Sequence, residues 1–293
     1  MDTLTCVVGM HRSGTSLTAQ LCHILGWPVS GSESQLGQGD IFNPLGYWEP
    51  KELTAINNQL LCMEGGNWRF VPRMSPGWAD HSRLTPLVES ARTFVTRINT
   101  RQVTWKDPRL SLTLPFWRPL LPSNTRYIVC LRHPYDVAES LRVRDHLDHR
   151  WGLLLWMAYT VHALVHTYGY LRMPLFYDDL IGSSYRTYIT EVDHFLNGSS
   201  GFPGTPSTSI IRPDFSHGQH GLSPISDDNG GELITALWNA LLAWRESGFT
   251  DDSRVMHLAR SYRPKSPWMT VTARPLGFWL RYAKMRLLNI IPL

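Results

Sequence analysis

Cysteine is scarce in this chain, with four residues among 293. Cys6, Cys22, Cys62 and Cys130 all stand in apolar surroundings, and their spacing fits neither a zinc site nor a disulfide framework. We therefore expect reduced thiols inside the core of a protein kept in a reducing compartment, and no metal centre built on cysteine.

Charge is also limited, because charged residues make up 18% of the chain and the formal net charge is +4. Lysine and arginine form no stripe or run, so the sequence predicts no nucleic-acid partner. A mildly positive protein suits a small anionic ligand. With 43% hydrophobic residues the chain can bury a sizeable core.

Three further features are missing: an internal repeat, a shift of composition that would mark a domain boundary, and a long apolar run ahead of the first expected strand. We therefore expect a single domain over 1–293. We also expect no signal peptide or membrane anchor before that strand, and a cytoplasmic location.

The most informative stretch covers residues 4–25. A short apolar run over 4–8 predicts a buried strand, Gly9 and Gly14 bound a loop, and apolar residues at helical spacing predict a helix over 15–25. Backbone N–H groups of such a loop and of the following helix N-terminus converge on an anion. The sequence therefore predicts an anion-binding cradle.

One residue of the usual nucleotide-triphosphate cradle is absent. Gly9 and Gly14 have the spacing of G-x-x-x-x-G-K-[ST], but Thr15 stands where the lysine should be, and Arg12 lies inside the loop. The missing lysine argues against hydrolysis of ATP or GTP with Mg²⁺. A purely structural turn is the alternative. Several side-chain donors of the segment favour anion binding instead: Arg12, Ser13, Thr15 and Ser16.

The run His11-Arg12-Ser13-Gly14-Thr15-Ser16 resembles the 5′-phosphosulfate loop of sulfotransferases that use 3′-phosphoadenosine 5′-phosphosulfate (PAPS). It is most similar to bacterial members that open Gly-Met-His-Arg-Ser-Gly-Thr-Ser, and it also resembles the Pro-Arg-Ser-Gly-Thr-Thr loop of tyrosylprotein sulfotransferases. The resemblance implies a P-loop-type three-layer α/β fold, with a central parallel sheet flanked by helices. It also implies that this run binds PAPS.

A second motif, Lys106-Asp107-Pro108-Arg109, follows a short strand predicted over 103–105. Its charged residues stand at the carboxyl edge of a strand, where open α/β sheets place their ligand crevice. A charged surface turn is the alternative. Bacterial sulfotransferases have a similar Lys-Asp-Pro-Arg, which implies that Lys106 contacts the transferring sulfuryl group. We expect Arg109 near the acceptor.

A third motif joins Arg132, at the end of a strand predicted over 127–131, to Ser140 in a helix predicted over 135–144. The pair resembles the residues that bind the 3′-phosphate of PAPS, and a bidentate guanidinium with a hydroxyl donor suits that group. The alternative is structural, with Arg132 in a salt bridge at the helix start and Ser140 as a small packing residue.

The acceptor side is predicted to come from a long loop over 27–46 and from the aromatic segment 43–49 that ends it. The segment resembles the bacterial Asn-Pro-x-Gly-Tyr-Phe-Glu, and rings beside a carboxylate suit a sugar platform. The alternative is a turn whose rings fill the core. We expect Asp40, Trp48 and Glu49 to contact the acceptor.

Acceptor activation requires a general base. In the tyrosylprotein enzymes a glutamate follows the loop arginine by the interval that separates Arg12 from Glu33 here, so the resemblance makes Glu33 the first candidate. Asp40, Glu49 and His11 are the alternatives, because the loop is long enough to bring other groups to the same place.

The remaining periodicity predicts helices over 51–62, 84–98, 151–168, 185–196 and 232–246, and a last parallel strand over 174–180. His162 and His166 are four residues apart in one of these helices. That spacing suits a shared metal, but no third ligand is evident, so solvated or capped histidines are the better interpretation.

Two stretches carry weaker signals. Residues 197–229 are rich in Gly, Ser, Pro and His, and we expect a mobile loop from which Arg212 and His217 close over the cofactor, as basic loops do in this superfamily. Residues 275–293 predict an apolar and basic helix. It packs on the body or on a partner, or it touches a membrane surface. No feature of the sequence predicts the oligomeric state.

The motifs together predict an enzyme that moves the sulfuryl group of PAPS to a hydroxyl group, with Arg12 and Lys106 as the stabilising cations and adenosine 3′,5′-bisphosphate as product. Twelve tryptophans and the aromatic segment favour a carbohydrate or glycolipid acceptor, and a secondary metabolite, a phenol or a peptide tyrosine stays open. The rival functions are a P-loop kinase-like phosphotransferase and a non-catalytic nucleotide-binding protein.

Overall fold

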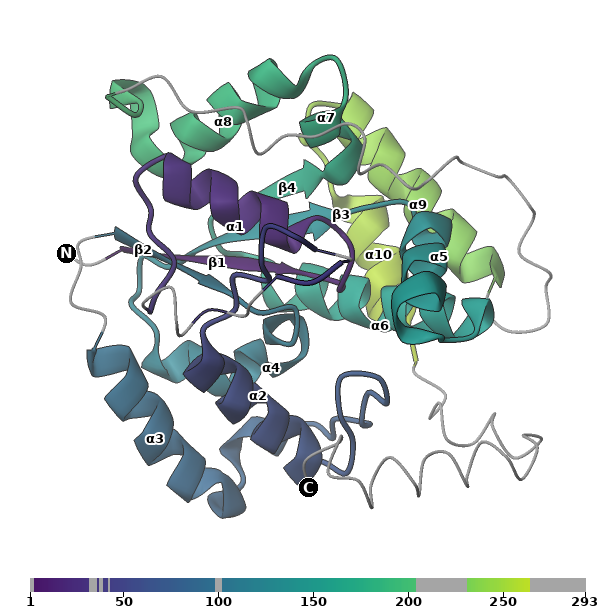
Figure 1. The fold of residues 1–293 in the computed structure, drawn as a ribbon. Helices are drawn as coiled ribbons and strands as arrows, with labels where there is room; N and C mark the ends of the chain where they lie inside the picture. The colour runs from purple at the N-terminus through teal and green to yellow at the C-terminus, as the bar shows by residue number, and fades with distance from the viewer. Residues whose placement is uncertain are drawn as a thin grey trace.

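The computed structural model describes residues 3–31, 36, 39–41, 43–97, 102–203 and 231–263. Within these residues the chain forms a four-stranded parallel sheet in the order β2-β1-β3-β4 (Figure 1). The strands are β1 (Thr3–Gly9), β2 (Gln102–Lys106), β3 (Arg126–Leu131) and β4 (Arg172–Phe176). The strands predicted over 4–8, 103–105 and 127–131 are therefore confirmed.

Both faces of the sheet are buried, which explains why its strands are nearly continuous apolar runs. Along β1, Leu4, Cys6 and Val8 belong to one core cluster, and Val7 belongs to the other. Ile128 of the neighbouring β3 packs on the same side as Val7. This alternation is the period of two expected for a strand between two helical layers.

Helices cover the two faces, as the three-layer prediction requires (Figure 1). One face carries α1 (Thr15–Ile24) and α8 (Tyr185–Asn197), and the other carries α2 (Lys51–Met63), α3 (Thr85–Thr96), α4 (Leu110–Trp117) and α6 (His149–His166). The remaining described helices are α5 (Pro134–Asp145), α7 (Tyr177–Ile181), α9 (Gly231–Glu246) and α10 (Ser253–Ser261).

The structure differs from the prediction at the last strand, at α4 and at α10, which was not predicted. The last strand ends at Phe176, because its register partner Leu131 is the last residue of β3, and Tyr177–Ile181 forms α7 instead. The prediction of a strand to 180 is therefore wrong in its second half. Helix α4 was not predicted, since its residues are apolar on every side and Pro115 interrupts the helical pattern.

The loop expected from 197 begins later than predicted. Asn197 is the last residue of α8, and Gly198–Ser200 forms a short 3₁₀ turn. Residues 204–230 and 264–293, which include Arg212, His217 and the expected C-terminal helix, lie outside the described residues.

The cysteines and histidines largely follow the prediction. All four thiols are free, and three of them are buried, but Cys62 is exposed on the solvent side of α2, so its expected burial is wrong. His162 and His166 each bond a backbone carbonyl through Nδ1, at 2.7 Å and 2.9 Å. Within the described ranges no group of metal-ligating side chains forms, and no helix is long and apolar enough to cross a bilayer.

Candidate functional site

The loop between β1 and α1 is held in a conformation that its glycines allow. Gly9 has φ of 138°, and a Cβ there would lie 2.5 Å from the carbonyl oxygen of Cys130. Gly14 has φ of 89°, and a Cβ there would lie 2.6 Å from the ring of Tyr177. The N–H of Gly9 donates to Ser111 Oγ at 2.9 Å, which fixes the start of the loop. The two glycines that bound the predicted cradle are therefore required by close contacts.

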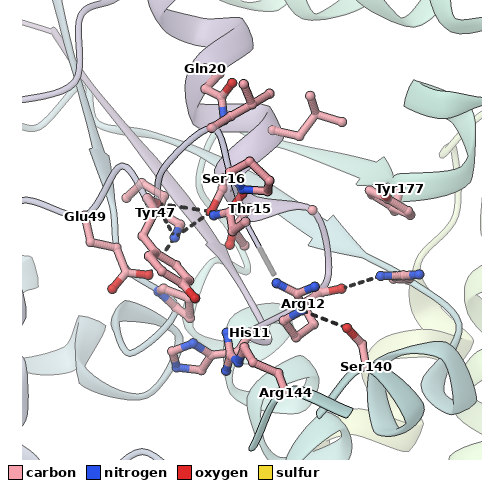
Figure 2. A pocket seen from close by; sticks show the side chains of 18 of the residues that line it. His11, Arg12, Thr15, Ser16, Gln20, Tyr47, Glu49, Ser140, Arg144 and Tyr177 are labelled. Atoms are coloured by element: carbon pink, nitrogen blue, oxygen red, sulfur yellow. Dashed lines mark hydrogen bonds and ion pairs between the residues drawn. The ribbon is translucent and has the colours of Figure 1, made fainter. Parts of the chain in front are cut away.

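The loop opens on a cavity of about 300 Å³ beyond the carboxyl ends of β1, β2 and β3 (Figure 2). Nine of the residues predicted from the sequence line it: His11, Arg12, Gly14, Thr15, Ser16, Glu49, Lys106, Arg132 and Ser140. Four predicted residues do not line it: Ser13, Asp40, Trp48 and Arg109. Glu33 and Arg212 lie outside the described residues.

Arg12, Arg132 and Ser140 form one side of the cavity. Arg12 Nε donates to Ser140 Oγ at 2.7 Å, and Arg132 Nη1 donates to the backbone oxygen of Arg12 at 3.0 Å. The Arg132 guanidinium also stacks 4.3 Å from the ring centroid of Tyr177. Three segments distant in sequence are thus tied together around two guanidinium groups. The structural alternative for Arg132, a salt bridge at the helix start, has no counterpart among its described contacts.

Lys106 occupies the opposite side, at the end of β2. Its Nζ donates to Glu49 Oε1 at 2.6 Å, to the backbone oxygen of Tyr47 at 2.8 Å and to Ser16 Oγ at 3.2 Å. Only 1% of its side chain is exposed. A buried ammonium group needs such partners, because an unpaired charge away from water is costly. Glu49 and the loop therefore hold Lys106 at the cavity.

Arg109 belongs to the same ionic network, because it contacts Glu49. Its Nη1 lies 2.8 Å from Asp107 Oδ1 and 3.4 Å from Glu49 Oε2. Burial disfavours the charged guanidinium of Arg109, but the charges of Asp107 and then of Glu49 act the other way, and the pKa of Arg109 lies above its ordinary value. Arg109 is thus an ionic support for Glu49, and its expected contact with the acceptor stays a prediction.

His11 lines the cavity together with Lys106 and Arg12, but its imidazole is uncharged. Burial, followed by the charges of Arg109 and Arg144, holds the pKa of His11 well below its ordinary value of 6.5. Its ring is 4.6 Å from that of Trp68, centroid to centroid. The buried Nε2 has no hydrogen-bond partner within the described residues. His11 is therefore neutral at pH 7 and a poor proton acceptor, because the imidazolium form would stand unpaired among cations.

Trp48 and Asp40 are not among the residues that line the cavity. Trp48 has a φ of 59°, and its ring lies 5.2 Å from that of His23 on α1. Its Nε1 donates to the carbonyl of Leu45 at 2.7 Å. Asp40 accepts from the hydroxyl of Tyr47 at 2.5 Å. The aromatic platform is thus represented in the cavity by Tyr47.

Several lining residues had no role in the prediction, among them Arg144 and Tyr177, and Tyr47 entered it only as part of the aromatic segment 43–49. The only sequence signal for Arg144 was its position four residues after Ser140, which puts both on one face of α5. The strand predicted over 174–180 includes Tyr177. The short helix α7 turns it toward Gly14 and Arg132 instead.

The side chains that line the cavity carry a net positive charge. Four cations, Arg12, Lys106, Arg132 and Arg144, face one carboxylate, Glu49, among the described lining residues. Burial is the largest cause that lowers the pKa of Arg12, and the charges of Arg144 and Arg132 add to it. Crowded guanidinium groups repel one another, so an anion that enters the cavity is stabilised.

Comparison with known proteins gives remote structural similarity. No protein-family model matches the chain, and no curated protein matches it in sequence. A sulfotransferase domain from the Synechococcus PCC 7002 olefin synthase is 18% identical, with a TM-score of 0.44, covering 81% of this chain and 94% of that domain. A sulfotransferase domain from the curacin biosynthetic pathway is 14% identical, with a TM-score of 0.46, covering 82% and 98%. Similarity of this degree does not carry the activity of those domains over to this chain.

Proposed function

We propose that this protein is a sulfotransferase that moves the sulfuryl group of PAPS to a hydroxyl group of an acceptor. The observation that carries the proposal is the placement of Arg132 and Ser140 around Arg12 on one side of the cradle, with Lys106 on the other. This arrangement offers two anion-binding positions joined by a glycine-bounded loop. PAPS carries two anionic ends, the 3′-phosphate and the 5′-phosphosulfate, so its chemistry fits the donors present.

The roles follow from these positions. Arg132 and Ser140 hold the 3′-phosphate, and the backbone N–H and hydroxyl groups of the loop from His11 to Ser16 hold the 5′-phosphosulfate. Lys106, with Arg12, stabilises charge on the sulfuryl oxygens and on the leaving phosphate oxygen as the group passes to the acceptor. A sulfuryl group carries less charge than a phosphoryl group, so side-chain cations replace the Mg²⁺ that phosphoryl transfer needs.

The acceptor of this reaction is a carbohydrate, a glycolipid or a secondary metabolite. Tyr47 supports a ring-shaped acceptor, because its side chain lines the cavity beside Glu49 and Lys106 (Figure 2). Contact of the C-terminal segment with a membrane surface and a cytoplasmic location stay predictions from the sequence.

The proposal predicts that adenosine 3′,5′-bisphosphate binds the protein without added metal and raises its melting temperature by mass action. Arg132→Ala should weaken that binding by roughly 1.5–3 kcal/mol, the worth of a charge-assisted bidentate contact. The same variant should affect adenosine 5′-phosphosulfate, which lacks the 3′-phosphate, far less. Isothermal titration of both ligands measures the difference.

Two results would contradict the proposal. Stabilisation by ATP with Mg²⁺ that exceeds stabilisation by the bisphosphate would favour a phosphotransferase. Bisphosphate binding without transfer of radiolabelled sulfate from PAPS into any acceptor of a host extract would favour a non-catalytic nucleotide-binding protein.

A further inference from the structure

Four cations among the described residues line the cavity, and Arg144 is the one to which the proposed binding of PAPS gives no role. It lies on α5, one turn after Ser140, and 12% of its side chain is exposed. Its Nε donates to Asp145 Oδ2 at 2.6 Å, which is the one hydrogen bond recorded for this guanidinium among the described residues. Asp145 thus orients the group while its two terminal nitrogens remain to meet a ligand.

Arg144 and Arg132 belong to different sides of Arg12. Figure 2 shows Tyr177 on one side of Arg12, and His11 and Tyr47 on the other, with Arg144 close to His11. The electrostatic contacts divide in the same way, because the charge of Arg144 acts on His11 and Tyr47, and that of Arg132 acts on Tyr177. The donor's 3′-phosphate belongs with Arg132, so Arg144 faces the space left for the acceptor.

The surroundings of Arg144 are short of negative charge. Asp145 also accepts from Arg69 Nη2 at 3.0 Å, so one carboxylate serves two guanidinium groups. Both guanidinium groups approach the ring of Trp68, at 4.8 Å for Arg69 and 5.8 Å for Arg144. This leaves a positive charge that the neighbouring residues do not neutralise.

An unpartnered polar atom lies at the same place. Nε2 of His11 is buried at the cavity wall with no hydrogen-bond partner among the described residues. Buried polar atoms are rarely left without a partner, and an orphan in a native structure marks a place where a ligand completes the bonding. A neutral imidazole with its proton on Nε2 donates one hydrogen bond.

We propose that Arg144 and His11 bind an anionic group of the acceptor, a carboxylate or a phosphate carried close to the hydroxyl that receives the sulfuryl group. The inference rests on the proposed function and adds the substrate class: the acceptor is itself an anion. A guanidinium and an N–H donor at one anion form the charge-assisted pairing that proteins use for such groups. A neutral acceptor would leave Arg144 desolvated and both donors unused.

The test is made on protein saturated with adenosine 3′,5′-bisphosphate, so that the donor cations are occupied. Two matched pairs of hydroxyl compounds serve as probes: 4-hydroxybenzoate against 4-hydroxybenzamide, and glucuronate against glucose. We expect the anionic member of at least one pair to bind about tenfold more tightly than the neutral member by isothermal titration.

Three variants separate the role of Arg144 from charge in general. Arg144→Gln should abolish the anionic preference, and Arg144→Lys should keep part of it. Arg142→Gln is the matched control, because Arg142 is exposed on the same helix and pairs with Glu139. It should leave the preference unchanged. Circular dichroism shows in each case that the variant is folded.

The outcomes distinguish this inference from the function on which it rests. Equal affinity within both pairs, or a preference that survives in Arg144→Gln, overturns the assignment of Arg144 to the acceptor and leaves the donor roles standing. A loss of bisphosphate affinity in Arg144→Gln as large as in Arg132→Ala would also overturn it, since Arg144 would then belong to the donor site. Failure of the wild type to bind bisphosphate would instead contradict the proposed function itself.

Discussion

Substitution of Gly14 by alanine has two separate costs, one from the positive φ and one from the contact with the ring of Tyr177, and a second glycine allows them to be measured separately. Gly14→Ala meets both the positive φ and the ring of Tyr177 at 2.6 Å, whereas Gly65→Ala meets a φ of 82° with no atom within 4 Å. We expect about 1 kcal/mol of destabilisation for Gly65→Ala. Gly14→Ala should cost about 1–3 kcal/mol more and weaken bisphosphate binding.

Urea denaturation of the two variants measures the difference. Equal losses at the two glycines would mean that Tyr177 moves aside freely, and that the close contact in the cradle has no energetic weight.

The general base is expected to be a single glutamate, and Glu49 and Glu33 are compared for that role. Glu49 already shares its oxygens with Lys106 and Arg109, which compete for the positions a proton would take. We therefore keep Glu33 as the expected base. Glu33→Gln should leave bisphosphate binding intact and lower turnover by about 10²–10⁴-fold.

Glu49→Gln and Asp40→Asn are measured beside it at saturating PAPS. Normal turnover in Glu33→Gln together with a collapse in Glu49→Gln would assign the base to Glu49 and show that the interval from Arg12 was accidental.

The sequence predicted the residues of the site better than their orientation. His11, Arg12, Lys106 and Arg132 line one cavity because strand ends and a glycine loop place them there, Ser140 reaches it from α5, and these signals are local. The direction of a loop side chain is decided by tertiary contacts, as when Trp48 turns to His23 instead of the cavity. Contacts of this kind produce no repeating pattern of residue types from which they could be predicted.

Among the elements, α2 and α4 are joined by one buried amide. Asn57 Nδ2 donates to Asp107 Oδ2 at 2.8 Å, and its Oδ1 accepts from Thr113 Oγ1 and Trp117 Nε1, each at 2.8 Å. Asn57→Ala removes all three bonds and leaves a buried carboxylate short of a partner. We expect about 2–4 kcal/mol of destabilisation.

Thr113→Val is the matched control. It should cost about 1 kcal/mol, because Trp117 still satisfies the amide oxygen. A change below about 0.5 kcal/mol for Asn57→Ala in urea denaturation would show that α2 and α4 are held by apolar packing alone.

Most elements with strong periodicity were predicted, although the amphipathic helix α10 was not, and the strand end that depends on a neighbour's length was not predicted either. Helix α8 alternates apolar and polar faces and was expected within a residue or two. Helix α4 is buried on every side, so no face marks it as a helix. The end of β4 is decided by the end of β3, which no pattern within residues 172–181 records.

At the scale of the whole molecule, buried histidines make stability depend on pH. The pKa values of His11, His162 and His166 lie below 6.5, mainly because burial disfavours the charged ring, and that of His166 falls to about 3. Below pH 6.5 the unfolded chain binds protons that the folded chain does not. The free energy of unfolding therefore falls as pH falls from 6.5, by at most about 1.4 kcal/mol per pH unit for each histidine.

Thermal unfolding between pH 7 and pH 5 measures this slope. His166→Asn keeps a donor near the carbonyl of Ser111 without titrating, and should flatten the slope. The exposed His81→Asn is the control. An unchanged slope in His166→Asn would exclude His166 as a source of acid sensitivity.

Arg12 has a φ of 69° in the middle of the cradle, a conformation that a side chain adopts at a cost of order 1 kcal/mol. It also stands among like charges. Random substitution would therefore tend to relax this loop, and glycine at this position would suit the empty protein at least as well. Arginine at this position is therefore explained by an anion that it binds, and not by the stability of the empty loop. We expect relatives that have lost the reaction to carry other residues at this position.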